Sequence, residues 1–408
     1  MAYLSSPEAA ASLREVVEHA YRHAPAVRER FARAGLSPQA IQAPDDLAHL
    51  PVLRKDELPA RQAAGLPFGG LLGTGVTRLE RIFMSPGPIY DPQAPGPDPW
   101  RMRPSLQAAG FAAGDLVINT FSYHFSPAGF MFDKPLTAMS CVVIPAGVGN
   151  QELAVRAMND LGVTGYVGVP SYLLALLHKA NEMGLRVPGA LALKKAFVTA
   201  EMLPETLRRS LTEEYGIQVT QGYGTADVGA IAHECGERAG MHLDAGIIVE
   251  LLDPATGRPV PPGEMGEVVV TLLDPTYPLL RFGTGDLSRL LPGACPCGDP
   301  APRLAGVLGR VGEAVKVRGM FVHPRQLDEV VRPFSVSRWQ AVVTQVDGVD
   351  ELRLLVEPAE GRDWEAGAPA RLTERARSEL RVRIAVEVVA PGSIAADAKR
   401  IDDRRRWK

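Results

Sequence analysis

Several features that define whole classes of protein are missing from this chain of 408 residues. No apolar run approaches the roughly 20 residues that a membrane-spanning helix needs, and the N-terminus has no basic segment followed by an apolar core. The sequence therefore predicts a cytoplasmic protein with no membrane partner. Its four cysteines are too few for a disulfide scaffold in a chain of this length.

A strong net charge is also missing, because the formal net charge is −3 and charged residues make up 22% of the chain. This balance provides no basic surface for nucleic acid. The sequence also lacks a nucleophile elbow, a dinucleotide-binding fingerprint and an interleaving of basic and aromatic residues. We therefore expect no nucleic-acid partner. We also do not expect a hydrolase with a nucleophile elbow or a dehydrogenase with a dinucleotide fingerprint.

The chain does contain a repeating pattern of short apolar strands and helices, between residues 114 and 220. This alternation predicts a parallel sheet covered on both faces. Strands and turns follow and predict a β-rich subdomain, and a glycine-containing break comes before a small α+β region. We therefore predict an α/β fold with a large N-terminal domain over residues 1–309 and a small mobile C-terminal domain over residues 310–408.

A glycine-rich segment, Gln221-Gly-Tyr-Gly-Thr-Ala-Asp227, directly follows a predicted strand. A parallel sheet binds its ligands at the carboxyl ends of its strands, and glycine lets the backbone approach a ligand closely. Tyr223 offers a ring to a base, and Asp227 offers a carboxylate to Mg²⁺. Taken alone, the segment is more typical of a polar, glycine-rich turn than of a nucleotide site.

Two further segments have residue types that suit a nucleotide. Asp286 ends a segment with two glycines, and its carboxylate can accept hydrogen bonds from both ribose hydroxyls. Arg310, Lys316 and Arg318 concentrate positive charge at the predicted domain boundary. The alternatives are a strand ending in a solvated aspartate and a charged linker.

The order and spacing of these three segments resemble the adenylate-forming acyl–CoA synthetases, specifically the phenylacetate–CoA ligase branch. Other stretches extend the resemblance over nearly the whole chain, namely residues 50–58, 66–69, 169–172, 200–201 and 389–394. Members of the family activate a carboxylic acid with ATP as an acyl-adenylate, and CoA then attacks after the small domain rotates. The resemblance implies this activity toward a small aromatic acid, with ATP, Mg²⁺ and CoA as cofactors, and a homodimer.

The resemblance also implies individual roles. Asp286 and Arg310 would bind ribose, Tyr223 would stack on adenine, and Asp227 would replace the usual glutamate at Mg²⁺. Other residues implied at the nucleotide are Ser85, Gly87, Ala200, Glu201, Gly222, Gly224 and Thr225. Those implied in the acyl pocket are Tyr123, His124, Phe125 and Tyr172, although a half-buried structural role is an alternative for His124. Lys316 would serve the thioester-forming conformation.

The sequence departs from the family pattern where the phosphates and the reacting carboxylate would lie. The phosphate loop Ser-Ser-Gly-Thr-Thr-Gly is Ser85-Pro-Gly-Pro-Ile-Tyr90 here, within a proline-rich stretch that predicts a loop over residues 85–104. Pro86 and Pro88 remove backbone donors. Asp397 stands where the family has its catalytic lysine, and Lys399 is the nearest substitute. A ligase-derived protein that no longer adenylates, and instead binds an acyl compound, a thioester or a protein partner, is therefore the alternative.

Cysteine and histidine spacing predicts a zinc site that does not depend on ATP. Cys235 and His242 form one pair and Cys295 and Cys297 another, which a β-rich fold can bring together as a closed, structural Cys₃His site. Similar cysteines occur in the phenylacetate–CoA ligase branch. His233 is an alternative ligand, and reduced cysteines without metal are the other interpretation.

Overall fold

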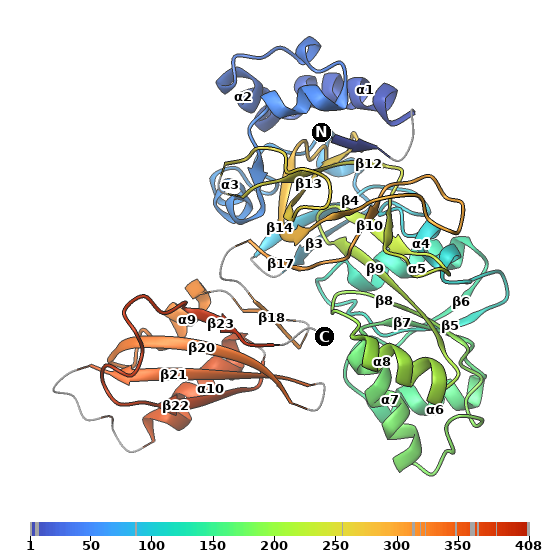
Figure 1. The fold of residues 1–408 in the computed structure, drawn as a ribbon, viewed down its shortest axis with the longest axis vertical. Coiled ribbons are helices and arrows are strands. Elements are labelled where there is room, and N and C mark those ends of the chain that lie inside the picture. Colours follow the sequence, from blue (N-terminus) through green and yellow to red (C-terminus); the bar gives the residue numbers. More distant parts are fainter. Residues whose placement is uncertain are drawn as a thin grey trace. The chain divides into compact units, whose positions relative to one another are not determined.

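The structure, a computed structural model, describes residues 2–4, 8–85, 88–254, 256–311, 315–318, 320–322, 324–346, 349–359, 364, 367–380 and 382–405. Two compact units comprise residues 1–311 and 312–408, and Figure 1 shows the ribbon of both. Among the described residues, no helix combines the length and the apolar character that crossing a membrane requires.

The helices of the first unit are mostly short. The first two pack against each other through the buried side chains of Val17 and Phe31, and Pro25 occupies the first turn of the second, where its missing N–H costs no hydrogen bond. The helices are α1 (Glu8–His23), α2 (Pro25–Arg33), α3 (Leu58–Ala64), α4 (Arg103–Ala108), α5 (Ala128–Ala138), α6 (Gln151–Leu161), α7 (Pro170–Glu182) and α8 (Glu205–Arg209).

A parallel sheet is the scaffold of this unit. Its strands pair in the order β9-β8-β7-β5-β6 and are β5 (Leu116–Asn119), β6 (Val142–Pro145), β7 (Gly165–Gly168), β8 (Lys195–Val198) and β9 (Gln218–Thr225). Every position of β7 is buried, as expected for a strand covered on both faces. Figure 1 shows α6, α7 and α8 beside these strands. The predicted βα layers are therefore confirmed.

Local signals set the ends of the helices between these strands. The side chain of Asn150 accepts a hydrogen bond from the Leu153 N–H at the start of α6, and Gly162 ends the helix with a φ of 66° that glycine adopts readily. The helical segment after β8 is divided, because α8 is followed by a π-helical turn, Ser210–Glu214.

Antiparallel strands extend the parallel sheet and build a second one. The extension continues from β9 through β10 (Gly229–Glu234), β11 (Met241–Leu243), β16 (Arg303–Leu304) and β15 (Leu290–Leu291). The second sheet runs through β1 (Ala2–Leu4), β12 (Ile247–Leu252), β13 (Gly266–Leu272), β14 (Phe282–Ser288) and β17 (Gly309–Arg310). Strand β2 (Leu53–Arg54) pairs in parallel with β14. Together these strands form the predicted β-rich subdomain.

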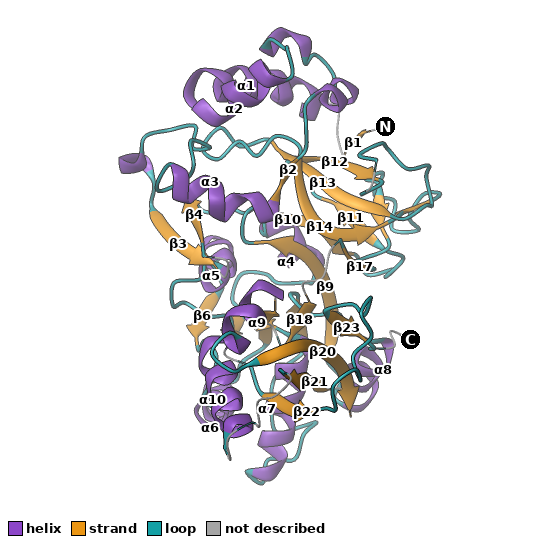
Figure 2. Cartoon of the chain, turned by 90° about the vertical axis from the view of Figure 1, so that its left-hand side faces the viewer, coloured by secondary structure: helices purple, strands orange, loops and turns teal. Residues whose placement is uncertain are grey.

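The prediction of a loop over residues 85–104 is wrong at both ends. Strands β3 (Arg81–Ser85) and β4 (Ile89–Gln93) pair as a hairpin, and α4 begins at Arg103 with Pro104 in its first turn. Pro92 is tolerated because the hairpin has only two strands, so an edge position needs no ladder donor. Figure 2 shows this hairpin with α3 beside it.

The second unit is a small α+β domain. Its main sheet has the order β22-β21-β20-β23 and contains β20 (Val336–Val346), β21 (Val349–Pro358), β22 (Ile384–Val388) and β23 (Ile401–Asp403). The remaining elements are β18 (Val315–Val317), β19 (Met320–Val322), α9 (Pro324–Val331) and α10 (Ala368–Leu380). Leu372, Ala376 and Leu380 are buried on one face of α10 because residues four apart lie on the same side of a helix.

Candidate active site

The residues predicted to bind ribose lie together. Asp286 on β14 is directly opposite Arg310 on β17, and the Arg310 Nε lies 2.8 Å from the Asp286 Oδ1. The hydroxyl of Tyr223 donates to the Asp286 Oδ2 over 3.0 Å. Burial, and next the charge of Asp286, raise the pKa of Tyr223 well above its ordinary value, so the phenol keeps the proton that it donates. The carboxylate is thus fixed by two partners at a strand end.

The glycines around Tyr223 have steric reasons to be glycine. A Cβ on Gly222 would lie 2.2 Å from the Phe197 ring, and one on Gly224 would lie 2.5 Å from the carbonyl oxygen of Gly229. The Thr225 hydroxyl accepts the Val228 N–H and closes the turn between β9 and β10. This turn carries Asp227, whose orientation is therefore set by the backbone.

Asp227 has a cationic partner that the sequence did not indicate. The ammonium of Lys55, which follows β2, pairs with the Asp227 Oδ2. Burial alone would lower the pKa of Lys55, but the charge of Asp227, with smaller contributions from Asp91 and Asp286, raises it, so the ammonium stays charged. Asp91 on β4 is a second acid that we did not predict here, and its side chain is almost completely buried.

The β3–β4 hairpin occupies the position of the family's phosphate loop, and we call it the phosphate hairpin. It provides few of the predicted contacts to phosphate. Ser85 is buried at the end of β3, and its hydroxyl donates to the Ile89 carbonyl over 3.5 Å. Gly87 lies outside the described residues. The backbone of Met84 donates to the carbonyl of Phe125, which joins the hairpin to the loop predicted to line the acyl pocket.

The segment after β8 also reaches the end of β9. Ala200 has a φ of +71°, a left-handed conformation that is costly for a residue with a side chain and is often found at functional sites. The Glu201 carboxylate accepts a hydrogen bond from the Ser171 hydroxyl over 2.6 Å, and the Gln221 side chain donates to the Glu201 carbonyl. The predicted segment 200–201 thus lies against Gln221, the first residue of the glycine-rich segment 221–227, which we call the Tyr223 motif.

The predicted acyl-pocket residues have different surroundings. Tyr123 packs edge-to-face against Phe130 and accepts a hydrogen bond from the Asn119 amide. His124 is exposed, and Phe125 is 75% exposed with a φ of 57°. Tyr172 is half-buried in the first turn of α7. The exposed aromatic ring of Phe125 is therefore the member of this set that is most available to a ligand.

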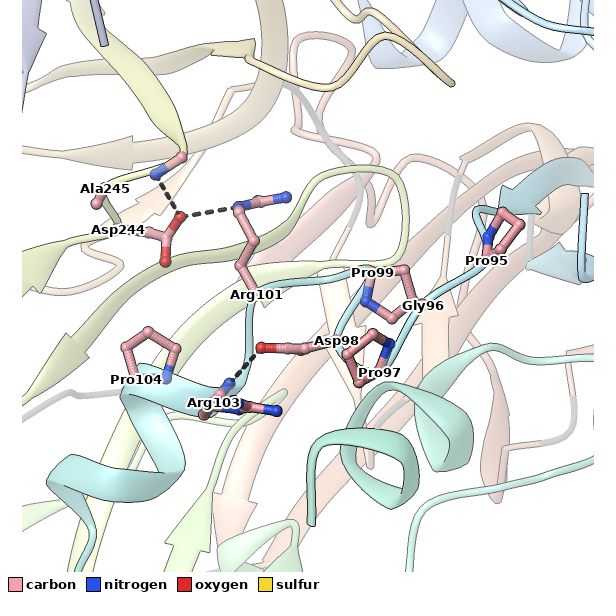
Figure 3. Close-up of a pocket in the computed structure, with 11 residues that line it drawn as sticks. Pro95, Gly96, Pro97, Asp98, Pro99, Arg101, Arg103, Pro104, Asp244 and Ala245 are labelled. Atoms are coloured by element: carbon pink, nitrogen blue, oxygen red, sulfur yellow. Dashed lines mark hydrogen bonds and ion pairs between the residues drawn. The ribbon is translucent and has the colours of Figure 1, made fainter. Parts of the chain in front are cut away.

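An open cavity lies elsewhere in this unit (Figure 3). It is lined by the proline-rich loop of residues 95–99 and by Arg101, Arg103, Pro104 and residues 244–246. Arg101 binds Asp244 over 2.8 Å, and Asp98 accepts from the backbone N–H groups of residues 102 and 103. None of the described lining residues is a predicted nucleotide, acyl or zinc residue, so the cavity does not mark the site.

The four predicted zinc ligands come together. Their donor atoms all lie within 4.8 Å of one another, with 3.7 Å between the sulfurs of Cys235 and Cys295 and 3.5 Å between the Cys297 sulfur and the His242 Nε2. Thiolates bound at about 2.3 Å to one tetrahedral zinc ion lie about 3.8 Å apart, so the donor set fits zinc. Asp299 faces the other nitrogen of His242 at 3.7 Å. His233, the alternative ligand, is not part of this group.

A buried ion pair joins the Cys₃His cluster of residues 235, 242, 295 and 297 to the Tyr223 motif. Glu234, next to Cys235, accepts the Gln221 N–H over 2.8 Å and pairs with Arg208 over 2.6 Å. Both Glu234 and Arg208 are buried, so the contact is shielded from water. The strand that holds Tyr223 is consequently fixed by the strand that ends in the cluster.

In the second unit, the segment with Lys399 is anchored on both sides. The Ile394 N–H donates to the Glu357 carboxylate, and the Ile394 carbonyl accepts from the Arg338 guanidinium. The Arg400 guanidinium lies over the Trp339 ring and pairs with Asp328. Lys399 and Asp397 are exposed. Lys316 lies on β18, and its side chain is outside the described part of the structure.

Comparison with known proteins decides the family. A family model described as "AMP-binding enzyme" matches residues 103–271, and one described as "AMP-binding enzyme C-terminal domain" matches residues 319–405. A phenylacetate–coenzyme A ligase of Pseudomonas putida is 30% identical over 331 residues, which cover 78% of this chain and 73% of that protein. The chain belongs to the phenylacetate–CoA ligase-like adenylate-forming enzymes.

Other relatives of this adenylate-forming enzyme agree with the assignment. The phenylacetate–coenzyme A ligase of Thermus thermophilus is 29% identical over 392 residues, which cover 93% of this chain and 87% of that protein. A crystal structure of 2-hydroxyisobutyryl-CoA ligase with 2-HIB-AMP and CoA superposes with a TM-score of 0.88 at 26% identity, covering 98% of this chain and 90% of that one. The predicted family and the predicted adenylate-forming fold are both confirmed.

Proposed function

We propose that this adenylate-forming enzyme activates a small carboxylic acid with ATP and transfers the acyl group to CoA. A carboxylate oxygen of the acid attacks the α-phosphorus of ATP, pyrophosphate leaves, and the CoA thiol then displaces AMP from the acyl-adenylate. The observation that carries this proposal is that Tyr223, on the parallel sheet, contacts the Asp286–Arg310 pair of the second sheet, in a fold shared with CoA ligases. The printed activities of these relatives support the reaction class.

The residues of the first unit would act mainly by positioning. The Asp286 carboxylate and the Arg310 guanidinium would hold the ribose hydroxyls, and the Tyr223 ring would lie against adenine. Asp227 would hold Mg²⁺, which neutralises charge on the leaving pyrophosphate when bound. Such preorganised charges account for most catalysis of phosphoryl transfer. From the second unit, Lys399 would approach the reacting carboxylate and Lys316 would serve thioester formation.

We propose an aromatic acid as the substrate, because Tyr123, Phe125 and Tyr172 lie on the segments that the family uses for its acyl pocket. The named substrates of the relatives are phenylacetate and 2-hydroxyisobutyrate. A substrate panel should therefore contain aryl, arylacetic and short 2-hydroxy acids. We further propose structural zinc at the Cys₃His cluster and a homodimer in the cytoplasm, where ATP and CoA are available.

The decisive experiment measures pyrophosphate release from Mg-ATP with this panel, and CoA thioester formation by mass spectrometry. We expect release that depends on one acid class, and a thioester as product. The second candidate, a protein that no longer adenylates, is favoured by Pro86, Pro88 and Asp397. Binding of AMP in calorimetry, without pyrophosphate release for any acid, would select that candidate.

A further inference from the structure

Several buried polar atoms beside the phosphate hairpin lack hydrogen-bond partners. Asp91 is 1% exposed, and no hydrogen bond of ordinary geometry reaches either of its carboxylate oxygens. The Asp227 Oδ1 and the Tyr277 hydroxyl are also buried without a partner. Unpaired buried oxygens are costly, and each such group in a folded protein requires an explanation such as a bound ion.

The three segments that carry these atoms pack together, because Ile89, Val228 and Tyr277 belong to one buried hydrophobic cluster. On β4, alternate side chains point inward, which buries Asp91 together with Ile89 and Gln93. Burial, and next the charge of Asp227, raise the pKa of Asp91 well above its ordinary value, and Ser85 offsets the rise only in part. After burial, the charges of Asp227 and Asp91 also raise the pKa of Tyr277.

The charges in this cluster do not balance. Lys55 pairs with the Asp227 Oδ2, whereas Asp286 is already paired with Arg310. With Asp91 and Asp227 ionised, one positive charge therefore faces two negative charges in a buried place. A divalent cation would reverse the balance to one excess positive charge, which suits the entry of the phosphates of a nucleotide.

We infer that Asp91 and Asp227 together hold a divalent cation, Mg²⁺ or Mn²⁺, before any nucleotide binds, and that Lys55 competes with this cation for Asp227. Carboxylate oxygens are hard donors that such ions prefer. Asp91 thereby gives the phosphate hairpin a metal ligand, where its prolines have removed N–H donors. The purpose of this ion rests on the proposed function, but its binding can be tested without any activity.

The test is a titration of the full-length, zinc-loaded protein with Mn²⁺ in the absence of nucleotide, followed by electron paramagnetic resonance. We expect Asp91→Asn to weaken Mn²⁺ binding by roughly 10- to 100-fold, as loss of an orienting metal-site group typically does. Lys55→Met should tighten binding, because it removes the competing ammonium. Asp160→Asn, on the exposed end of α6, is the matched control and should leave binding unchanged.

Thermal melting provides a second readout that is independent of turnover. Mn²⁺ should raise the Tm of the natural protein and of the Asp160→Asn variant, but not that of Asp91→Asn. Equal Mn²⁺ affinity in the natural protein and Asp91→Asn, or no binding to either, would overturn the inference and leave Asp91 as a protonated acid beside an ion pair. Pyrophosphate release measured on the same samples separates this result from a failure of the proposed function.

Discussion

The ribose end of the site, on β9, β14 and β17, and its phosphate end, on β4 and the turn after β9, differ in how completely their charges are paired. At the ribose end, Asp286 has a guanidinium on one side and a phenol on the other. At the phosphate end, no hydrogen bond of ordinary geometry reaches the Asp91 oxygens, and Asp227 has a partner on one oxygen alone. Where the carboxylate is already paired, the site can bind neutral ribose hydroxyls. Where carboxylates are unpaired, their negative charge repels phosphate, so a cation must bind first.

The largest effect should come from breaking the ribose end. Asp286→Ala removes the acceptor for the ribose hydroxyls and the ion pair with Arg310, so we expect roughly a 100- to 1,000-fold loss in kcat/KM for pyrophosphate release. Calorimetry should show that ATP and AMP lose affinity together, since both contain the ribose. The control is Asp160→Ala, and unchanged turnover in Asp286→Ala would exclude the nucleotide assignment.

A second large effect should follow from opening the zinc cluster. Cys295→Ser removes one ligand from the group at the end of β10, the strand that pairs with the strand of Tyr223, so we expect loss of bound zinc and a fall in Tm of roughly 5–15 °C. Cys141→Ala, at a cysteine of the buried core away from the cluster, is the control and should keep its zinc. The prediction would be contradicted if the natural protein were purified without zinc and its Tm did not change on addition of a chelator.

The contribution of the second unit should be smaller. Lys399→Ala removes the exposed ammonium from an anchored segment, and we expect roughly a tenfold loss in the rate of acyl-adenylate formation because developing phosphate charge is less stabilised. Asp397→Lys should act in the opposite direction. If both variants form the adenylate as fast as the natural protein in single-turnover measurements, Lys399 is not the substitute for the family lysine.

The smallest effect should come from restoring the phosphate loop. Replacing Pro86 by Ser and Pro88 by Thr returns two backbone donors and two hydroxyls, so we expect ATP affinity to rise by about tenfold, equivalent to about 1.4 kcal/mol. AMP affinity should stay unchanged, which sharpens the contrast between the two ends. An equal gain for both nucleotides would show that the change acts on the whole domain instead.

Sequence patterns predicted the parts of the fold and site that depend on regular spacing. The alternation of apolar strands and helices predicted the parallel layers, and cysteine and histidine spacing predicted a cluster that the structure brings together. Asp91 was missed because the density of prolines around it favoured a loop, which concealed the alternation of inward side chains on β4. Lys55 was missed because its partner Asp227 is 172 residues away, and no local pattern reports such a contact.

The pairing of β2 with β14 has a consequence for how the protein is made. Leu53 and Arg54 find their strand partners at Phe282 and Gly283, and Arg54 also pairs with Glu267 on β13. During synthesis, β2 therefore cannot pair until β14 has been made, which requires most of the first unit to have left the ribosome. Contacts of such long sequence separation form slowly, and the waiting chain exposes apolar surface. We therefore expect the segment that contains β2 and Lys55 to depend on chaperones during translation.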